Sequence, residues 1–490
     1  MRKSTNKNKL SKNHEHNVQL INDHLRIDKN FDLIDQAYHF GGRAIKLYVV
    51  DGFADDLVLT KILERLSTLE EDALSEDPLT RLEERMIPNI EIEREDKLDD
   101  LLSEILSGQA VFLVEGCDEA LLLDTRIYPV REPQEPDMER VARGAKDGFV
   151  ETLVFNAGLV RRRIRDPGLI NEHMEVGRRS KTDISISYID TIADPELIRR
   201  IKKKIKAIDI DGLPMADKTI EEFIIKENFA PFPQVRYTER PDTAAVHLME
   251  GHVLIFVDGS NVAMMMPTTF WDHMQHAEEY RQEPIVGFFL RWVRFLAVFI
   301  SIFLVPVWLL ISNNEGLGPE AWDFIGVEEE YNIPLFWQLI IAEFGLQVLR
   351  MAAIHTPDAL ATALSLVAAI LIGEIGVEVG VFTGEVVLYV AVSALGGYAT
   401  PSYELGLFNG ILRFILLLSV GFFSVYGFVI GATIIFIWLV QTKILNSPYM
   451  WPLIPFNGKA LVDIIFRPPY TVKNYRPSYT HPLDRKRQSN

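Results

Sequence analysis

One block of the sequence, residues 285–445, is far more apolar than the rest and limits what the chain can fold into. Residues 295–311 and 414–439 contain no Asp, Glu, Lys or Arg at all. A helix needs about 20 apolar residues to cross the hydrocarbon core of a bilayer, whereas a buried helix of a water-soluble protein is usually shorter and interrupted by polar residues. The block therefore predicts an integral membrane protein with a large, charged, water-soluble front half.

Charge and cysteine content exclude several classes of function. The formal net charge is −18 and the pI is near 5.2, so the chain lacks the positive charge on which nucleic-acid binding depends. The single cysteine, Cys117, has no partner for an intramolecular disulfide. The N-terminus is polar and basic, and no apolar signal segment follows it. We therefore expect a cytoplasmic front half and no nucleic-acid partner.

The sequence pattern of the front half predicts two α/β subdomains, at residues 31–128 and 129–284, after a disordered tail at residues 1–30. Alternating or continuous apolar runs bounded by glycine and aspartate predict strands, and longer periodic runs predict helices. The expected strands are 43–50, 110–115, 120–124, 183–190, 244–249, 252–258 and 261–266, and the clearest expected helices are 57–69 and 195–207. Basic clusters within 161–165, 178–181 and 199–206 are either solvated helix faces or contacts to anionic headgroups or to an acidic partner domain.

Charge on the two sides of the apolar block predicts its orientation. Residues 295–349 contain no Lys or Arg, and the loop at 313–332 is strongly acidic. The positive-inside rule then places the front half and the tail, residues 446–490, in the cytoplasm and that loop outside. An even number of spans follows, and we expect four to six within 285–445. They lie near 295–312, 335–353, 359–380, 385–400 and 408–441, the last being one bent span or a tight hairpin around 424–431.

Charged residues within this block are the candidate functional residues. Glu343, Gln347 and Arg350 share one helix face, while Glu374 and Glu378 are one turn apart and Glu385 follows. Charge facing lipid is costly, so such groups usually face a bundle interior or water. Two interpretations stay open: an interfacial helix with an external loop, or a carboxylate-lined cation path or its gate. With so few polar groups per chain, a pore needs several copies around an axis.

Small residues and missing motifs complete the sequence evidence. The spacing of Gly373, Gly376 and Gly380 predicts close helix packing. The chain contains no GxxxxGK[ST], HExxH, GxSxG or CxxC motif. We therefore expect no enzyme activity, no cofactor and no metal site.

Several long segments resemble one known family. They are GGRAIKLYVVDG at 41–52, the run at 131–164 around ETLVFNAGLVRRRI, PFPQVRYTERPD at 231–242, EGHVLIFVDGS at 250–260, ATPSYELG at 399–406, and the run at 447–469 that begins SPYMWPLIPFNGKA. The chain resembles the A subunits of GerA-type spore germination receptors, and most closely a branch of sporulation proteins within that family.

The resemblance implies a cytoplasmic region of two α/β subdomains followed by a multi-span domain in the inner spore membrane. It also implies a role in germination, when monovalent cations leave the spore, and assembly with other spore germination membrane proteins. The resulting expectation is an oligomeric cation channel subunit, or its gate, in contact with membrane lipid. The rival expectations are a non-conducting scaffold that clusters germination proteins and, less favoured by the acidic spans, a transporter for a small anion.

Overall fold

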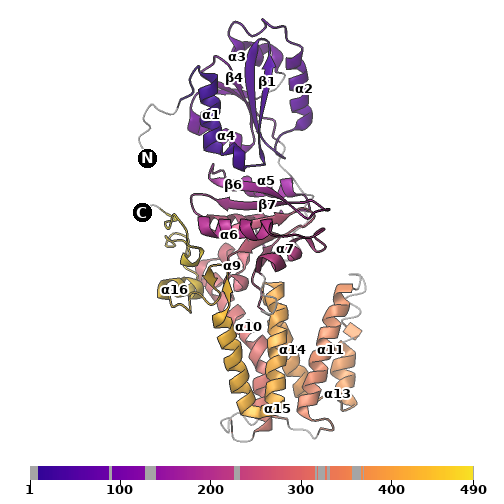
Figure 1. Cartoon of the computed structure of the whole chain (residues 1–490). Coiled ribbons are helices and arrows are strands. Elements are labelled where there is room, and N and C mark those ends of the chain that lie inside the picture. Colours follow the sequence, from indigo (N-terminus) through magenta and orange to yellow (C-terminus); the bar gives the residue numbers. More distant parts are fainter. Residues whose placement is uncertain are drawn as a thin grey trace. The chain divides into compact units, whose positions relative to one another are not determined.

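Two compact units make up the computed structural model (Figure 1), which describes residues 9–87, 91–126, 139–225, 232–314, 317, 326–327, 331–355, 366–367 and 369–488. The first unit combines Met1–Asn228, Val235–Pro267 and Tyr470–Asn490, and it holds two five-stranded sheets. The second combines Phe229–Gln234 with Thr268–Pro469, and it holds the long apolar helices. The expected fold class, two α/β subdomains followed by membrane helices, is confirmed.

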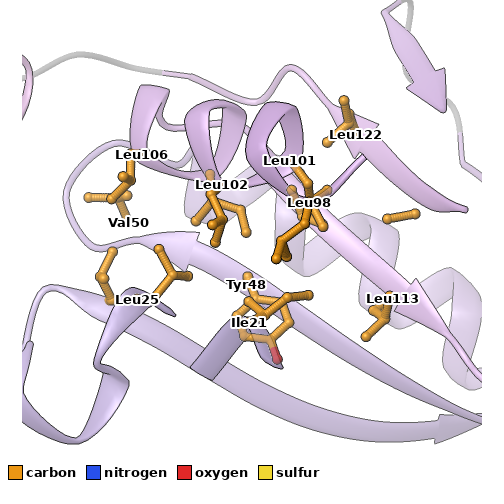
Figure 2. Packing of buried hydrophobic residues seen from close by; sticks show 14 of the residues in the cluster. Ile21, Leu25, Tyr48, Val50, Leu98, Leu101, Leu102, Leu106, Leu113 and Leu122 are labelled. Carbon is orange, nitrogen blue, oxygen red and sulfur yellow. The ribbon is translucent and has the colours of Figure 1, made fainter. Parts of the chain in front are cut away.

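The first sheet has the order β1-β2-β4-β5-β3, with every neighbouring pair antiparallel. Its strands are β1 (Leu33–Phe40), β2 (Arg43–Val50), β3 (Ile92–Glu95), β4 (Ala110–Val114) and β5 (Ala120–Leu123). Successive side chains of a strand point to opposite faces, so Tyr48 and Val50 pack with α1 (His14–Leu25) and α4 (Leu98–Ser107), as Figure 2 shows. Leu47 and Val49 pack with α2 (Asp56–Ser67) and α3 (Pro78–Arg81) on the other face.

The N-terminal helix α1 corrects one expectation. Residues 14–25 are not disordered, because Ile21 and Leu25 lie four residues apart on one helix face and are both buried in the core. The side chain of Asn13 caps the helix by accepting a hydrogen bond from the backbone N–H of His16. The many polar residues of this segment form the solvated face of a short amphipathic helix.

The second sheet has the order β6-β7-β9-β10-β8 and is also antiparallel throughout. Its strands are β6 (Leu169–Val176), β7 (Thr182–Ile189), β8 (Arg236–Thr238), β9 (Val253–Val257) and β10 (Ala263–Met266). Leu254 and Phe256 of β9 pack with α5 (Leu153–Arg161) and α8 (Pro241–Met249). Two further helices, α6 (Pro195–Lys206) and α7 (Ala216–Ile225), pack on each other.

The expected strand at 244–249 is wrong, because these residues belong to helix α8. Pro241 occupies the first turn of that helix, where its fixed φ angle and missing N–H cost nothing. A short apolar run cannot be assigned to strand or helix by periodicity alone, and here the proline decides it. The strands expected at 43–50, 183–190, 252–258 and 261–266 and the hairpin of 110–115 with 120–124 are confirmed within two residues.

The second unit contains α9 (Ala277–Arg281), α10 (Pro284–Asn313), α11 (Leu335–His355), η5 (Ile370–Ile375), α13 (Gly376–Glu378), α14 (Gly384–Tyr398), α15 (Tyr403–Gln441) and α16 (Gly458–Phe466). Two short strands, β11 (Lys443–Ile444) and β12 (Ser447–Pro448), precede α16. Among the described residues, three helices are long and apolar enough to cross a membrane: α10, residues 335–352 of α11, and α15. The 15-residue α14 is apolar but shorter.

Helix α15 is a hairpin rather than one span. A straight helix of its 39 residues is about 58 Å long, nearly twice the roughly 30 Å hydrocarbon core. Ser424 interrupts it with φ 51° and ψ −133°, and a side chain on Gly427 would collide with the carbonyl oxygen of Ser419. The chain therefore reverses at Ser424, and the hairpin alternative is correct. We call residues 403–423 the first arm and residues 425–441 the second arm.

Contacts between the helices fix their directions. Between α10 and α14, residue numbers rise on one helix as they fall on the other, in the pairs Ala297–Gly396, Ser301–Ser393 and Trp308–Tyr389. Between α10 and the first arm, the numbers rise together, in the pairs Ser301–Arg413 and Asn314–Ser424. They also rise together between α11 and α14, in the pairs Gln338–Thr383 and Arg350–Tyr398. Helices α11 and α14 are therefore antiparallel to α10 and to the first arm.

These directions place His355 and Gly384 at opposite ends of the bundle. The span expected at 359–380 falls between these two residues, but residues 356–365 and 368 lie outside the described ones, so that span stays a prediction. The expected total of four to six spans stays a prediction as well.

Candidate functional site

A buried ion pair between Glu343 and Arg413 lies inside the helical bundle. The two residues are 2% and 3% exposed, and they come from α11 and the first arm of α15. Nη2 of Arg413 donates a hydrogen bond of 2.7 Å to Oε2 of Glu343. Nε lies 2.7 Å from Oε1, as an ionic contact whose angles fall outside hydrogen-bond geometry. The guanidinium thus meets both carboxylate oxygens, one through a charge-assisted hydrogen bond and the other through an ionic contact.

Two serines connect the same guanidinium to the remaining helices. Nη1 of Arg413 donates to the carbonyl oxygen of Ser301 on α10 at 2.8 Å and to Oγ of Ser393 on α14 at 2.9 Å. The Ser393 hydroxyl in turn donates to the Ser301 carbonyl at 3.1 Å. Gly396 permits this approach, because a side chain there would collide with the carbonyl oxygen of Ala297. One arginine side chain therefore joins α10, α11, α14 and α15.

Gln347 and Arg350 continue the same side of α11. Together with Arg413 they line a cavity of about 10 Å³, roughly the room of one water molecule. The guanidinium of Arg350 lies 5.1 Å from the ring centre of Tyr398 on α14, a cation–π contact. The three residues expected on one face of a helix therefore all point toward α14 and α15. Whether they conduct or gate ions stays a prediction.

The three other candidate carboxylates lie apart from this pair. Glu374 on η5 and Glu378 on α13 are exposed, and Glu385 is half-buried in the first turn of α14. They lie near the end of the bundle where Gly380 approaches Asn332. The structure therefore separates the six candidates: Glu343, Gln347 and Arg350 lie on one side of α11, and the three other carboxylates lie elsewhere.

The three candidate packing glycines have different surroundings. A side chain on Gly376 would collide with the Phe382 ring, whereas one on Gly373 would meet open space among the described residues. Gly380 has φ +76° and forms the turn after α13, a conformation that favours glycine. Close packing of long helices instead occurs at Gly396 against α10 and at Gly421 against the ring of Phe336.

Arg413 is the site residue that sequence reasoning missed. A signal for it exists, because Arg350 and Arg413 are the only basic residues between positions 295 and 440 apart from histidine. An intramembrane cation requires an acceptor, and Glu343 is the carboxylate on the candidate face of α11. The sequence does not pair them, because they are 70 residues apart.

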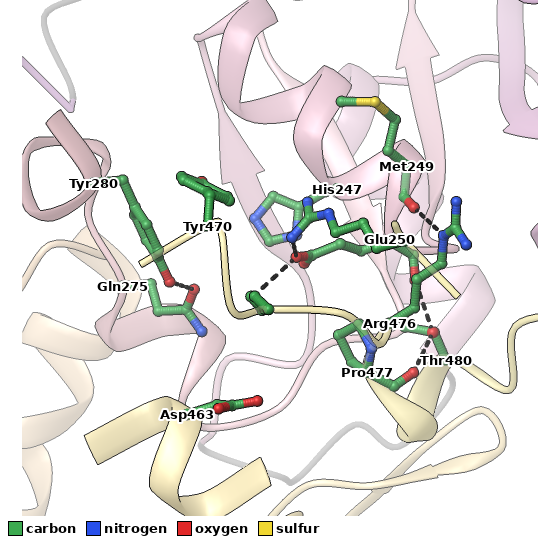
Figure 3. A network of polar contacts seen from close by, with 12 residues as sticks. His247, Met249, Glu250, Gln275, Tyr280, Asp463, Tyr470, Arg476, Pro477 and Thr480 are labelled. Atoms are coloured by element: carbon green, nitrogen blue, oxygen red, sulfur yellow. Dashed lines mark hydrogen bonds and ion pairs between the residues drawn. The ribbon is translucent and has the colours of Figure 1, made fainter. Parts of the chain in front are cut away.

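A second buried polar cluster lies in the first unit, where the C-terminal segment docks beside the turn after α8 (Figure 3). The possible ligand atoms of His247, Glu250 and His252 lie within 4.8 Å of one another. The two ring nitrogens of His252 lie 2.9 Å from the His247 carbonyl and 2.9 Å from the Tyr479 hydroxyl. Glu250 contacts Nζ of Lys473 at 3.3 Å and Nη1 of Arg487 at 3.2 Å.

Charge balance in this cluster favours a structural role over a metal. Burial opposes ionisation of Glu250, but the nearby charges, led by Lys473, lower the pKa of its carboxyl to about 2. Burial lowers the pKa of His247 well below 6.5. A divalent cation would add positive charge to a carboxylate that two cations already balance. The cluster instead fixes the C-terminal segment, whose Thr480 hydroxyl donates to the Glu250 carbonyl at 2.9 Å.

Comparison with known proteins gives consistent matches along the chain. Stage V sporulation protein AF of Bacillus subtilis is 48% identical over 446 residues, covering 91% of this chain and 90% of that protein. Spore germination protein KA of Bacillus subtilis is 29% identical over 90% of this chain and 81% of its own length. The N-terminal domain of the A subunit of the Bacillus megaterium spore germinant receptor GerK3 covers 54% of this chain and 97% of that structure, with 28% identity and a TM-score of 0.42.

The expected resemblance, including its sporulation branch, is confirmed by the match to Stage V sporulation protein AF and by one family model. That model, described as Bacillus/Clostridium GerA spore germination protein, matches residues 20–479. The matched residues include both sheets, the buried Glu343–Arg413 pair and α16. The chain belongs to the GerA family of spore germination proteins.

Proposed function

We propose that this chain is a subunit of an oligomeric cation channel, or the gate of one, that promotes ion release during spore germination. It acts in the inner membrane of the endospore as a multi-pass protein with both termini in the cytoplasm. Its partners are further copies of itself, other spore germination membrane proteins and membrane lipid, and it carries out no catalysis. Two findings support this assignment: membership of a spore germination family and three helices, among the described residues, that are long and apolar enough to cross a membrane.

The observation that carries the proposal is the buried pair of Glu343 and Arg413. Removing two charges from water costs several kcal/mol per ion in a protein interior, and well-packed apolar residues often replace such a pair without loss of stability. Packing alone therefore gives no reason to keep charges inside a membrane bundle. Ionisable residues at membrane depth usually serve ion pathways, relays or sensors.

The arrangement favours a gate. Arg413 fully engages the carboxylate of Glu343, so this carboxylate attracts no cation while the pair is formed. Movement of the first arm of α15 away from α11 would release it, and it would then face the small cavity beside Gln347 and Arg350. A freed carboxylate in a water path attracts cations. Glu374, Glu378 and Glu385 would concentrate cations at the external end of the same subunit.

Conductance of the purified full-length chain tests this function. The protein is reconstituted in planar bilayers under a potassium gradient, alone and co-expressed with candidate membrane partners. We expect cation-selective current that changes in Glu343→Gln. The double exchange Glu343→Arg with Arg413→Glu is the matched control, because it keeps both charges while reversing their positions. Absence of current from folded, oligomeric protein under every pairing would contradict a channel.

One observation favours the rival function, a non-conducting scaffold. The Glu343–Arg413 pair is satisfied within one chain and joins four helices, as a purely structural clamp would do. A scaffold predicts that Glu343→Gln reduces the assembly of germination proteins in the membrane to the same degree as it reduces protein stability. A channel predicts altered ion release at matched protein level and unchanged assembly.

A further inference from the structure

The short helix α16 presents apolar side chains that no described part of the protein covers. None of its nine residues is buried. Phe456, just before the helix, is 74% exposed, and Val462 and Phe466 are 52% and 55% exposed. Exposed aromatic and aliphatic side chains that lie together mark a surface for another apolar phase. The question is therefore what covers this side of α16.

Arg291 holds the C-terminal half of α16 in place. Its side chain is buried, and Nη1 donates to the carbonyl oxygens of Asp463 at 3.1 Å and Ile464 at 2.5 Å. The last carbonyls of a helix lack partners within the helix, so the guanidinium acts as a cap. Nε of Arg291 donates to the buried carboxylate of Glu279 at 2.7 Å, and Arg294 pairs with the other oxygen of that carboxylate.

Further contacts fix how α16 is turned. The ring of Phe466 stacks on Phe288 of α10, with centroids 5.6 Å apart and planes within 2°. Nη2 of Arg467, the residue after the helix, donates to the carbonyl oxygens of Tyr280 at 2.9 Å and Gln282 at 3.2 Å. The side chain of Asn457 caps the first turn. The exposed apolar side is therefore held in a defined direction.

The position of α16 along α10 identifies what it meets. Helix α10 has 30 residues and is about 45 Å long, which exceeds the roughly 30 Å hydrocarbon core. Its charge-free run begins at residue 295, so the turns that hold α16 lie at the interface between hydrocarbon and water. These turns also expose apolar groups: Ile285 is 77% exposed, Phe289 64% and Trp292 47%. Aromatic residues are enriched at this depth.

We propose that α16 is an interfacial helix that binds the phospholipid leaflet from which α10 enters the membrane. Phe456, Val462 and Phe466 contact the acyl-chain boundary, continuing the lipid-facing surface of α10. Asp463 lies about 100° around the helix from Val462 and faces the headgroups and water, whereas Lys459 lies at the edge of the apolar side, where its long side chain reaches the headgroups. The Arg291–Glu279 pair keeps α16 and α10 together, so the helix fixes the depth at which the first span begins.

Spin-label accessibility in nanodiscs tests this placement on the full-length chain, independently of channel function. Cys117, the single cysteine, is changed to serine, and single cysteines are introduced at Lys459, Val462, Asp463 and Phe466 for labelling. The nanodiscs contain phosphatidylcholine and phosphatidylglycerol. Oxygen partitions into the acyl region, whereas an uncharged, water-soluble nickel chelate stays in the aqueous phase. The ratio of the label's accessibility to oxygen to its accessibility to nickel therefore reports its depth. Phe299→Cys within α10 and Leu57→Cys on α2, both exposed apolar positions, are the membrane and water references.

We expect the oxygen-to-nickel ratio at positions 462 and 466 to approach that at 299 and to exceed several-fold the ratio at 463. The ratio at 459 should lie between these values, because residue 459 shares nearly the same side of the helix as residue 466. Ratios at 462 and 466 equal to that at 57 would place α16 in water and overturn the proposal. Low accessibility to both reagents at 462 and 466 would also overturn it, because that result means that protein, in the same chain or in another copy, covers this side. Thermal unfolding of each labelled variant confirms that the fold is intact.

Discussion

Arg413 donates through Nη2 to Oε2 of Glu343 at 2.7 Å, across the contact between the first arm of α15 and α11. The first prediction is that breaking this pair from either side destabilises the helical unit. Glu343→Gln and Arg413→Met each leave a buried charge without its partner, and each should reduce the free energy of unfolding by about 3–5 kcal/mol. Thermal or denaturant unfolding of the purified protein in detergent measures the change.

A double-mutant cycle separates the pair from the packing around it. Glu343→Leu combined with Arg413→Met removes both charges at similar volume, and its stability should return to within about 1–2 kcal/mol of the unchanged protein. Additive losses in the double variant would mean that each residue acts through other contacts. If the double variant is stable and no longer releases ions, the charges serve function.

A second buried pair predicts how the two α/β subdomains are joined. Asp32, just before β1, and Arg161 of α5 are both fully buried. The guanidinium donates to Oδ2 of Asp32 at 2.5 Å and to Oδ1 at 3.1 Å, and Asn171 of β6 also donates to Oδ2 at 3.0 Å. Asp32→Asn should therefore reduce the free energy of unfolding by about 3–5 kcal/mol. Limited proteolysis should then cut the chain faster between the subdomains.

Glu196→Gln is the matched control for this carboxylate-to-amide change. Glu196 pairs with Arg200 on the surface of α6, where both side chains are about half exposed. Exposed pairs contribute only about 0–1 kcal/mol, so this variant should unfold almost like the unchanged protein. Equal losses in the two variants would show that burial of the Asp32–Arg161 pair does not decide its contribution.

How far the sequence predicts the molecule depends on the range of the interactions concerned. Strand β2 and the β4–β5 hairpin follow from alternation and glycine turns, which are local signals. Helix α1 was missed because its stripe of Ile21 and Leu25 is narrow within a polar segment, and only the sheet beneath supplies its partner. Helix α8 is the opposite case. Its apolar run alone predicts a strand, but the structure has a helix there, with Pro241 in its first turn.

The candidate site divides in the same way. Helical periodicity places Glu343, Gln347 and Arg350 on one face, and the structure confirms that shared direction. Which residue meets Glu343 is a long-range property, because Arg413 lies on another helix 70 residues away. Periodicity also groups Glu374 with Glu378, but it cannot show that the chain between α11 and α14 turns them toward the end of the bundle.

The third prediction concerns pH and the docking of the C-terminal segment. His247 is held neutral because burial lowers its pKa well below 6.5, and the carboxyl of Glu250 has a pKa of about 2 against an ordinary 4.5. Both folded values are depressed, so both groups stabilise the fold at neutral pH and lose that contribution on acidification. The loss begins below pH 6.5 for His247 and between pH 4.5 and about 2 for Glu250.

His247→Gln tests the first of these two steps. Its melting temperature should change less between pH 7.5 and pH 5 than that of the unchanged protein, because the buried group that takes up a proton on unfolding is gone. His16→Gln, at an exposed position of α1, controls for loss of a histidine. Protease accessibility of residues 470–488 should rise at pH 5 in the unchanged protein. The same pH dependence in both variants would exclude His247 as its source.

The last prediction concerns Ser424, which turns the α15 hairpin with φ 51° and ψ −133°. This backbone conformation is strained for any residue with a side chain and typically costs about 1–3 kcal/mol. The Ser424 hydroxyl compensates in part by donating to Oδ1 of Asn314 at 3.0 Å. Ser424→Gly relieves the strain and loses the hydrogen bond, whereas Ser424→Ala keeps the strain and loses the bond. Ser424→Gly should therefore unfold at a higher temperature than Ser424→Ala, by about 1 kcal/mol or more in free energy.

Ser419, within the first arm, provides the matched control. There Ser419→Ala should be more stable than Ser419→Gly, because glycine is the poorer helix former by about 1 kcal/mol. If alanine is also better than glycine at 424, the chain continues as a helix at this position and the hairpin is wrong.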